Sequence, residues 1–145
     1  MAMRRRTRAR ELALQLLYQL DLRGEDVLAI QRAVRRVEIS DALLRYVTAV
    51  VRATRPGEGA PEPVTRYLRW GAGPRAGQAL VLCAKARALL HGRFAVTLPD
   101  IRAIAPSALR HRLLLNFQAE ADDVGADEII ERVFEAVPEP RSPLA

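Results

Sequence analysis

Apolar residues recur three and four positions apart along most of this chain, which is the spacing of the buried face of an amphipathic helix. The alternating pattern that would indicate a strand extends no further than residues 93–97. The pattern therefore predicts an all-α protein, a helical bundle with an extra helix at its N-terminus. The predicted helices cover residues 4–23, 26–37, 41–54, 74–90, 98–105 and 126–136.

Residues with known capping roles mark several of the predicted helix ends. Ser40 can accept a hydrogen bond at the start of one helix, and Thr97 with Asp100 forms a capping box at the start of another. Pro74 suits a first helical position, whereas Pro106 is expected to end a helix, because proline lacks the amide proton. The connecting segments are predicted to be an irregular loop over residues 56–63, a helical turn or extended piece over 64–70, and a second loop over 120–125.

Charge is distributed unevenly along the chain. Residues 1–115 hold 21 basic and 9 acidic side chains, whereas residues 116–145 hold 2 basic and 8 acidic ones. The net charge of +6 thus combines a basic part of +12 with an acidic part of −6. This asymmetry predicts two faces that contact different partners.

The sequence also bears on the cellular compartment and on metal chemistry. No apolar run approaches the roughly 18 residues of a membrane-spanning helix, and the arginine-rich start lacks the apolar block of a secretory signal. We therefore expect a cytoplasmic protein with no membrane contact. The single cysteine, Cys83, excludes a disulfide framework, and its apolar neighbours predict that it is buried. His91 and His111 have no carboxylate or cysteine at ligand spacing, so we expect neither a metal site nor a catalytic base.

Arg75 is the first candidate for function, because it occupies the second position of the helix predicted to begin at Pro74. The free backbone N–H groups and the positive end of the helix dipole favour an anion there. An arginine at this place adds like charge, which makes sense where a phosphate lies nearby. The same position also suits an ordinary solvated arginine, so the flanking sequence has to decide between the two interpretations.

Residues 70–76 are Trp-Gly-Ala-Gly-Pro-Arg-Ala. This stretch resembles the start of the sensor helix in the C-terminal lid domain of MoxR-type AAA+ ATPases, where a turn with Trp or Tyr precedes Gly-Ala-Ser-Pro-Arg-Ala. Here Gly73 replaces the serine, which removes a side-chain cap but keeps a tolerated N-cap residue. The resemblance extends over about residues 26–138. It also rests on Val37–Asp41, Val51–Arg55, Ala84–Arg93, Val96–Ile101 and Ala105–Leu115.

The resemblance implies a lid that closes over a nucleotide held by a separate AAA+ core domain. Arg75 would sense the γ-phosphate of ATP, and Gly73 and Pro74 would bind the nucleotide beside it. ATP and Mg²⁺ would be held only together with that core. A ring oligomer, chaperone-like remodelling and von Willebrand-type partner proteins are also implied. The chain has no glycine-rich loop ending in Lys-Ser or Lys-Thr, and its only lysine, Lys85, falls inside a predicted helix. We therefore expect no ATP hydrolysis by this chain alone.

The N-terminal residues do not resemble the lid family. An arginine-rich arm that leads into an apolar helix is similar to the opening of NusB-type RNA-binding proteins, and closely spaced arginines can neutralise RNA phosphates. A NusB-type transcription antitermination factor is therefore the alternative function. A natural fusion, a misplaced gene start or assembly join, and chance similarity are all open explanations for the mixed resemblance. The candidate RNA-binding residues are Arg4, Arg5, Arg6, Arg8 and Arg10.

These features predict an arm and helix over residues 1–24, a lid domain over 25–138, and a proline-rich disordered tail over 139–145. A third hypothesis is an adaptor that takes the lid position on another subunit. Three further arginines either pack within the domain or contact the core, and these are Arg55, Arg110 and Arg112.

Overall fold

The computed structural model describes residues 24–140. It divides into two units, residues 1–36 and 37–145, each of which is considered by itself. In the first unit the described part is α2 (Gly24–Arg36), which agrees with the predicted second helix. The predicted helix over residues 4–23 lies outside the described residues.

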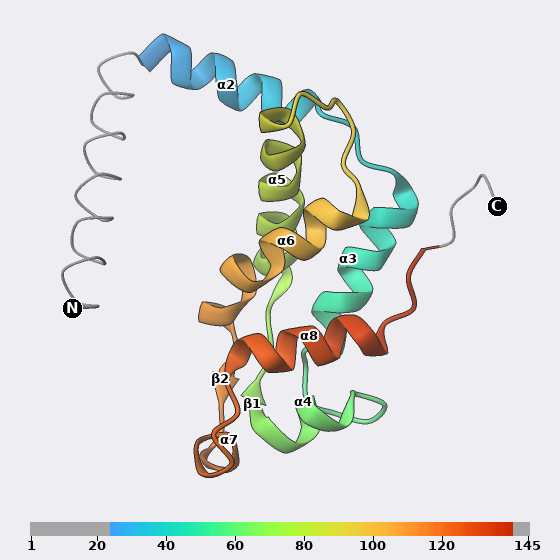
Figure 1. The fold of residues 1–145 in the computed structure, drawn as a ribbon, viewed down its shortest axis with the longest axis vertical. Helices are drawn as coiled ribbons and strands as arrows, with labels where there is room; N and C mark the ends of the chain where they lie inside the picture. Colours follow the sequence, from blue (N-terminus) through green and yellow to red (C-terminus); the bar gives the residue numbers. More distant parts are fainter. Residues whose placement is uncertain (1–23, 141–145) are drawn as a thin grey trace. The chain divides into compact units, whose positions relative to one another are not determined.

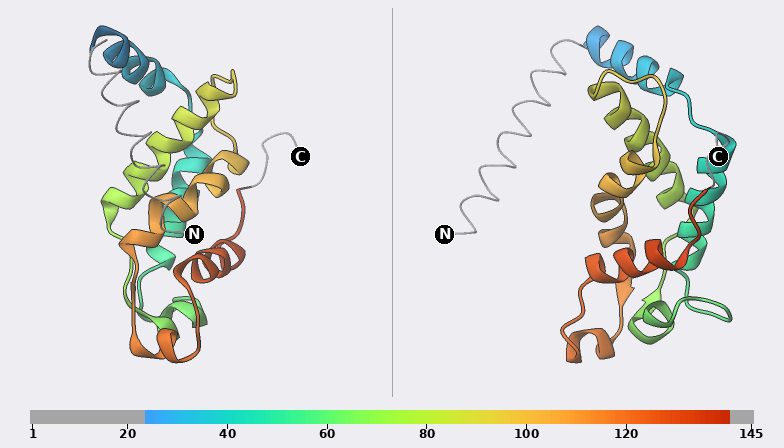
Figure 2. Two further views of the ribbon diagram at one scale, coloured as in Figure 1. Left: turned by 60° about the vertical axis from the view of Figure 1, so that its left-hand side comes forward. Right: turned by 45° about the vertical axis from the view of Figure 1, so that its right-hand side comes forward.

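The second unit is built mainly from helices (Figure 1), as the hydrophobic pattern predicts. A short antiparallel ribbon joins the segments before and after the central helices, pairing Leu68 with Leu115 and Trp70 with Leu114. Figure 2 shows α5 and α6 running beside each other within this unit. Its elements are α3 (Asp41–Ala53), α4 (Glu62–Tyr67), β1 (Leu68–Trp70), α5 (Pro74–Leu90), α6 (Leu98–Leu109), a 3-10 turn η1 (Arg110–Arg112), β2 (Leu114–Leu115), α7 (Phe117–Ala121) and α8 (Ala126–Ala136). Within residues 24–140, no helix is both long and apolar enough to cross a membrane.

Local capping signals predict the helix starts well. The Ser40 hydroxyl accepts a hydrogen bond from the Leu43 amide at 3.3 Å, and Pro74 is the first residue of α5. The capping box at the start of α6 forms, with the Asp100 carboxylate accepting from the Thr97 amide at 2.9 Å. These starts are set by residues close in sequence, which is why the sequence pattern identifies them.

The expected break at Pro106 is wrong, because α6 continues through it to Leu109. Ile101, Ala105 and Leu109 are spaced at four-residue intervals and are all buried. Burying this apolar face against the rest of the unit outweighs the cost of about 3 kcal/mol for a proline inside a helix.

The predicted loop over residues 120–125 is partly wrong, since Glu120 belongs to α7. The Asn116 side chain caps this short helix by accepting a hydrogen bond from the Ala119 amide at 3.1 Å. The chain then reverses at Asp123, whose φ of 54° lies in the left-handed region that aspartate tolerates better than most residues. The N-cap signal of Asn116 was not part of the prediction.

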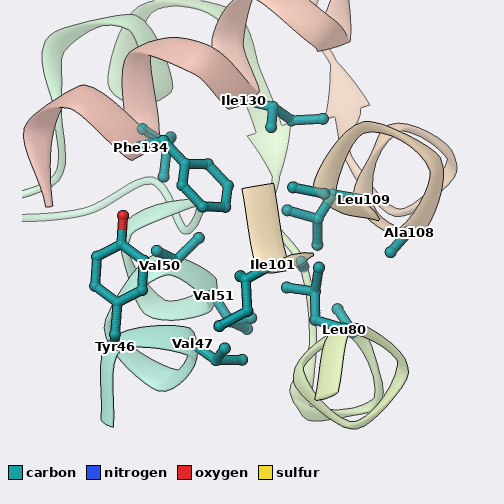
Figure 3. Packing of buried hydrophobic residues seen from close by; sticks show 14 of the residues in the cluster. Tyr46, Val47, Val50, Val51, Leu80, Ile101, Ala108, Leu109, Ile130 and Phe134 are labelled. Atoms are coloured by element: carbon teal, nitrogen blue, oxygen red, sulfur yellow. The ribbon is translucent and has the colours of Figure 1, made fainter. Parts of the chain in front are cut away.

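The core lies where α3, α5, α6 and α8 meet (Figure 3). Tyr46 of α3 and Phe134 of α8 pack edge to face with ring centroids 6.1 Å apart. In α5 the buried residues recur every fourth position, from Ala76 through Leu80 to Ala88. Cys83 falls outside this stripe and is exposed, so the prediction that it is buried is wrong. In a helix with apolar residues on all sides, the sequence does not mark which side is buried.

A buried carboxylate ties the end of α5 to the start of α6. Asp100 is only 1% exposed, and Arg93 donates to its two oxygens at 2.7 Å each. The Thr97 hydroxyl donates to Asp100 Oδ2 at 2.8 Å, and Arg87 Nε lies 3.5 Å from Oδ1. The hydrogen bonds from Arg93 hold the pKa of Asp100 well below its usual range, although burial acts in the opposite direction.

This lowered pKa predicts a specific loss of stability in acid. Because the folded-state pKa of Asp100 lies below the unfolded value of about 3.9, its stabilising contribution is present above that pH and is lost as the pH falls below it. We expect the free energy of unfolding to fall more steeply below about pH 4 in the wild type than in Asp100→Asn. Denaturant titrations between about pH 6 and pH 3 measure this difference. Parallel pH profiles for the two proteins would contradict it.

Candidate functional site

The turn that leads from β1 into α5 is fixed by the end of α3. The buried Ala72 donates its amide hydrogen to Thr54 Oγ1 at 2.9 Å, and its carbonyl accepts a hydrogen bond from Arg55 Nε at 3.1 Å. Thr54 is fully buried and donates its own hydroxyl hydrogen to the Val51 carbonyl at 2.7 Å. We call the hydrogen bonds of Thr54 and Arg55 to Ala72 the Ala72 clamp.

Gly71 makes the close approach of this turn possible. A β-carbon at Gly71 would lie 2.1 Å from the Thr54 carbonyl oxygen and 2.5 Å from its carbonyl carbon. Both atoms belong to the backbone, so they cannot move aside as a flexible side chain would. Only glycine fits here without displacing the end of α3.

The N-terminus of α5 carries neither a side-chain cap nor an acidic residue in its first turn. Its N-cap is Gly73, in extended conformation, and Pro74 follows at the first helical position. By contrast, α3 begins with Ser40 and Asp41, which supply a hydroxyl and a carboxylate. The positive end of the α5 dipole is thus left without a negative group from its own first turn.

Arg75 lies at this end of α5 with its side chain exposed. Within residues 24–140 it forms no side-chain hydrogen bond or ion pair. Gly73, Pro74 and Arg75 are therefore adjacent at an exposed, uncapped helix start, as the sequence predicts. This arrangement can accept an anion from outside the described part of the chain, and a phosphate matches both the guanidinium and the helix end.

An exposed apolar surface adjoins this turn. Trp70, the residue before Gly71, is 65% exposed, and its partner in the ribbon, Leu114, is also exposed. Two large apolar side chains that are exposed side by side are typical of a surface that another protein domain covers.

The comparisons with known proteins decide the family. Residues 63–133 match the family model of the AAA lid domain. The chain is 35% identical over 117 residues to Chaperone MoxR1 of Mycobacterium tuberculosis, and this match covers 80% of the chain. It is also 35% identical over 119 residues to Protein MoxR of Methylorubrum extorquens, a match that covers 77% of the chain. A crystal structure of a proposed ATPase from Cytophaga hutchinsonii is similar with a TM-score of 0.74 at 37% identity, over 79% of this chain and 35% of that one. This chain carries a lid domain of the MoxR-type AAA+ family.

The lid domain spans only about a third of the length of these relatives, 31% of Chaperone MoxR1 and 34% of the Methylorubrum protein. No finding above supports the NusB-type alternative. The five arginines proposed to bind RNA, Arg4, Arg5, Arg6, Arg8 and Arg10, lie outside the described residues.

The remaining candidate arginines of the lid domain make contacts within it. Arg55 belongs to the Ala72 clamp, and Arg110 forms a bidentate pair with Asp127 at 3.0 and 2.7 Å. Arg112 donates to the Ala108 carbonyl and contacts the His111 ring. Each thus has a packing role, which was one of its two predicted interpretations.

The site of the lid domain fits an anion better than a metal ion. Within the described residues, no group of three or more histidine, cysteine, aspartate or glutamate side chains is placed to hold a metal. The first turn of α5 also lacks the carboxylate oxygens that Mg²⁺ prefers. The residues present therefore match a phosphate, and any Mg²⁺ would need ligands from another domain.

Sequence reasoning located Arg75 in the lid domain but missed what holds it. In the family resemblance Thr54 and Gly71 are matching positions to which the sequence assigns no role. Thr54 and Ala72 are 18 residues apart, and no local pattern reports a contact over that distance. A threonine near a helix end followed later by a glycine turn is the sole, weak signal in the sequence.

Proposed function

We propose that this lid domain senses ATP through Arg75 when it docks on an AAA+ nucleotide-binding core. The observation that carries the proposal is an exposed arginine, Arg75, that has no side-chain partner within residues 24–140 and lies at the uncapped start of α5. A γ-phosphate held by the core would accept hydrogen bonds from the Arg75 guanidinium and would balance the positive end of the α5 dipole. The core would supply the phosphate-binding loop and the ligands of Mg²⁺.

The part of each relative that lies outside its match with this chain supports the same proposal. About two thirds of Chaperone MoxR1 lies outside the match, which is ample for a separate nucleotide-binding domain. Chaperone MoxR1 is named for a chaperone role, and we extend ATP-driven, chaperone-like remodelling in a cytoplasmic ring to the complete assembly of this lid. Von Willebrand-type partner proteins belong to the proposal through the family resemblance alone.

Arg75→Ala is expected to abolish the preference of the lid for an ATP-loaded core. The 145-residue chain would be titrated by calorimetry into the part of Chaperone MoxR1 outside the match, with ATPγS or with ADP bound. A charge-assisted hydrogen bond is worth about 1.5–3 kcal/mol, so the wild type should bind roughly 10-fold to 150-fold more tightly with ATPγS. The variant should bind equally with both nucleotides and keep its melting temperature.

Arg45→Ala is the matched control, because Arg45 is an exposed arginine on α3 away from the turn. It should keep the full preference for ATPγS. Equal affinity of the wild type for both nucleotide states would refute the proposal, as would a preference that survives in Arg75→Ala. The purified chain alone should release no phosphate from ATP, and measurable turnover would also count against it.

A further inference from the structure

We infer that Thr54 and Arg55 are positioning residues for Arg75, which attach the start of α5 to α3 so that the arginine moves only together with the rest of the lid. This inference rests on the proposed function of Arg75. It adds that the ATP response depends on two residues that touch neither the nucleotide nor Arg75.

The Ala72 clamp fixes the backbone three residues before Arg75. Both polar backbone groups of Ala72 are held, and they are held by consecutive residues, Thr54 and Arg55. The amide and the carbonyl of Ala72 belong to consecutive peptide units, so neither unit can rotate without breaking one of the two hydrogen bonds. The direction in which the chain enters α5 is thus set by the end of α3.

Thr54 transmits this restraint into the body of α3. Its hydroxyl accepts from Ala72 and donates to the Val51 carbonyl, so both of its hydrogen-bonding roles are filled. Because Thr54 has no exposed surface, the loss of either hydrogen bond would leave a buried polar group unsatisfied. Breaking the hydrogen bond between Thr54 and Ala72 is therefore costly, and this bond holds the turn firmly to α3.

The contacts that the chain makes with α3 before and after Arg75 support the same conclusion. Before it, the backbone of Gly71 lies against the Thr54 carbonyl, with no room for a β-carbon. After it, the position of a β-carbon at Gly77 lies 3.7 Å from Val51 Cγ2 and 3.8 Å from Val47 Cγ1, which is ordinary contact. The chain thus lies against the end of α3 at Gly71 and against the side chains of α3 at Gly77, and Arg75 lies between these two positions.

Arg55 offers a part of the clamp that can be removed without opening the core. Arg55 is exposed, and the hydrogen bond to the Ala72 carbonyl is the only one that its side chain forms within residues 24–140. Arg55→Ala should therefore fold as the wild type does, which matters because Thr54→Val changes a buried site. Thr54→Ser restores the hydroxyl and serves as the rescue variant.

The first arm of the test uses the chain alone. Amide hydrogen exchange at Ala72, followed by NMR, should be about tenfold faster in Thr54→Val than in the wild type, which corresponds to the loss of one buried hydrogen bond. In Thr54→Ser it should stay near the wild-type rate. Unchanged exchange in Thr54→Val would overturn the clamp itself, whatever the role of Arg75.

The second arm uses the calorimetric titration described for Arg75. The ratio of affinities with ATPγS and ADP should fall at least about fivefold in Thr54→Val and Arg55→Ala and recover in Thr54→Ser, while the affinity with ADP stays constant. A merely structural role would weaken both affinities together, and that result would overturn the inference. If the wild type shows no preference, the proposed function fails and the positioning role fails with it, while the first arm still decides whether the clamp exists.

Discussion

Replacement of Asp100 by alanine is expected to lower the free energy of unfolding by about 3 kcal/mol, because removing one partner of a buried ion pair typically costs about 3–5 kcal/mol. The substitution leaves Arg93 and Arg87 without their shared carboxylate and removes the acceptor of the Thr97 capping box. Both arginine side chains are 38% exposed and can be rehydrated, which places the effect at the lower end of the range. Urea denaturation followed by circular dichroism measures the change.

Glu139→Ala is the matched control for this prediction. Glu139 also pairs with an arginine, Arg102, but its side chain is 54% exposed. Solvent-exposed ion pairs contribute at most about 1 kcal/mol, so this variant should lose far less stability. Equal losses in the two variants would show that burial of Asp100 does not determine its contribution.

Gly71→Ala is expected to destabilise the lid by about 3 kcal/mol, the upper end of the usual range for an overpacked site. The added methyl group would meet the Thr54 carbonyl oxygen at 2.1 Å, and only movement of the backbone can relieve the contact. We expect the Ala72 amide to exchange faster as well, because that movement separates the turn from α3. Denaturation and hydrogen exchange on the same sample test both effects.

Gly57→Ala provides the comparison, because a β-carbon at Gly57 meets nothing within 4 Å. Its backbone is not in the left-handed region, so alanine should be neutral or raise the stability by up to about 1 kcal/mol. A Gly71→Ala protein as stable as Gly57→Ala would mean that the turn does not pack against α3 in solution.

Features that depend on neighbouring residues could be predicted from the sequence. Pro74 and the Thr97–Asp100 box specify helix starts within four residues, and the position of Arg75 in the first turn of α5 follows from such a start. The predicted helix end at Pro106 is wrong because the cost of proline's missing amide proton is outweighed by burial against residues far away in the chain. In α5, where apolar residues surround the helix, no local rule separates the exposed Cys83 from the buried Leu80.

The supports of the candidate site could not be predicted for the same reason. The Ala72 clamp joins residues 17 and 18 positions apart, and the contact of Arg110 with Asp127 spans another 17. Hydrogen bonds of this kind appear only once the helices have packed, since they depend on the final distance between elements. The family resemblance supplied Arg75, whereas the physical reason for its fixed place came from the structure.

The position of Trp70 gives the lid a built-in optical reporter. It is the only tryptophan in the chain, it lies directly before Gly71, and the residue is 65% exposed. Indole emission shifts to shorter wavelength when a partner excludes that water, so docking at the turn changes the fluorescence of the unlabelled protein. Trp70 thereby lets occupancy of this surface be followed in real time, with no dye attached to the molecule.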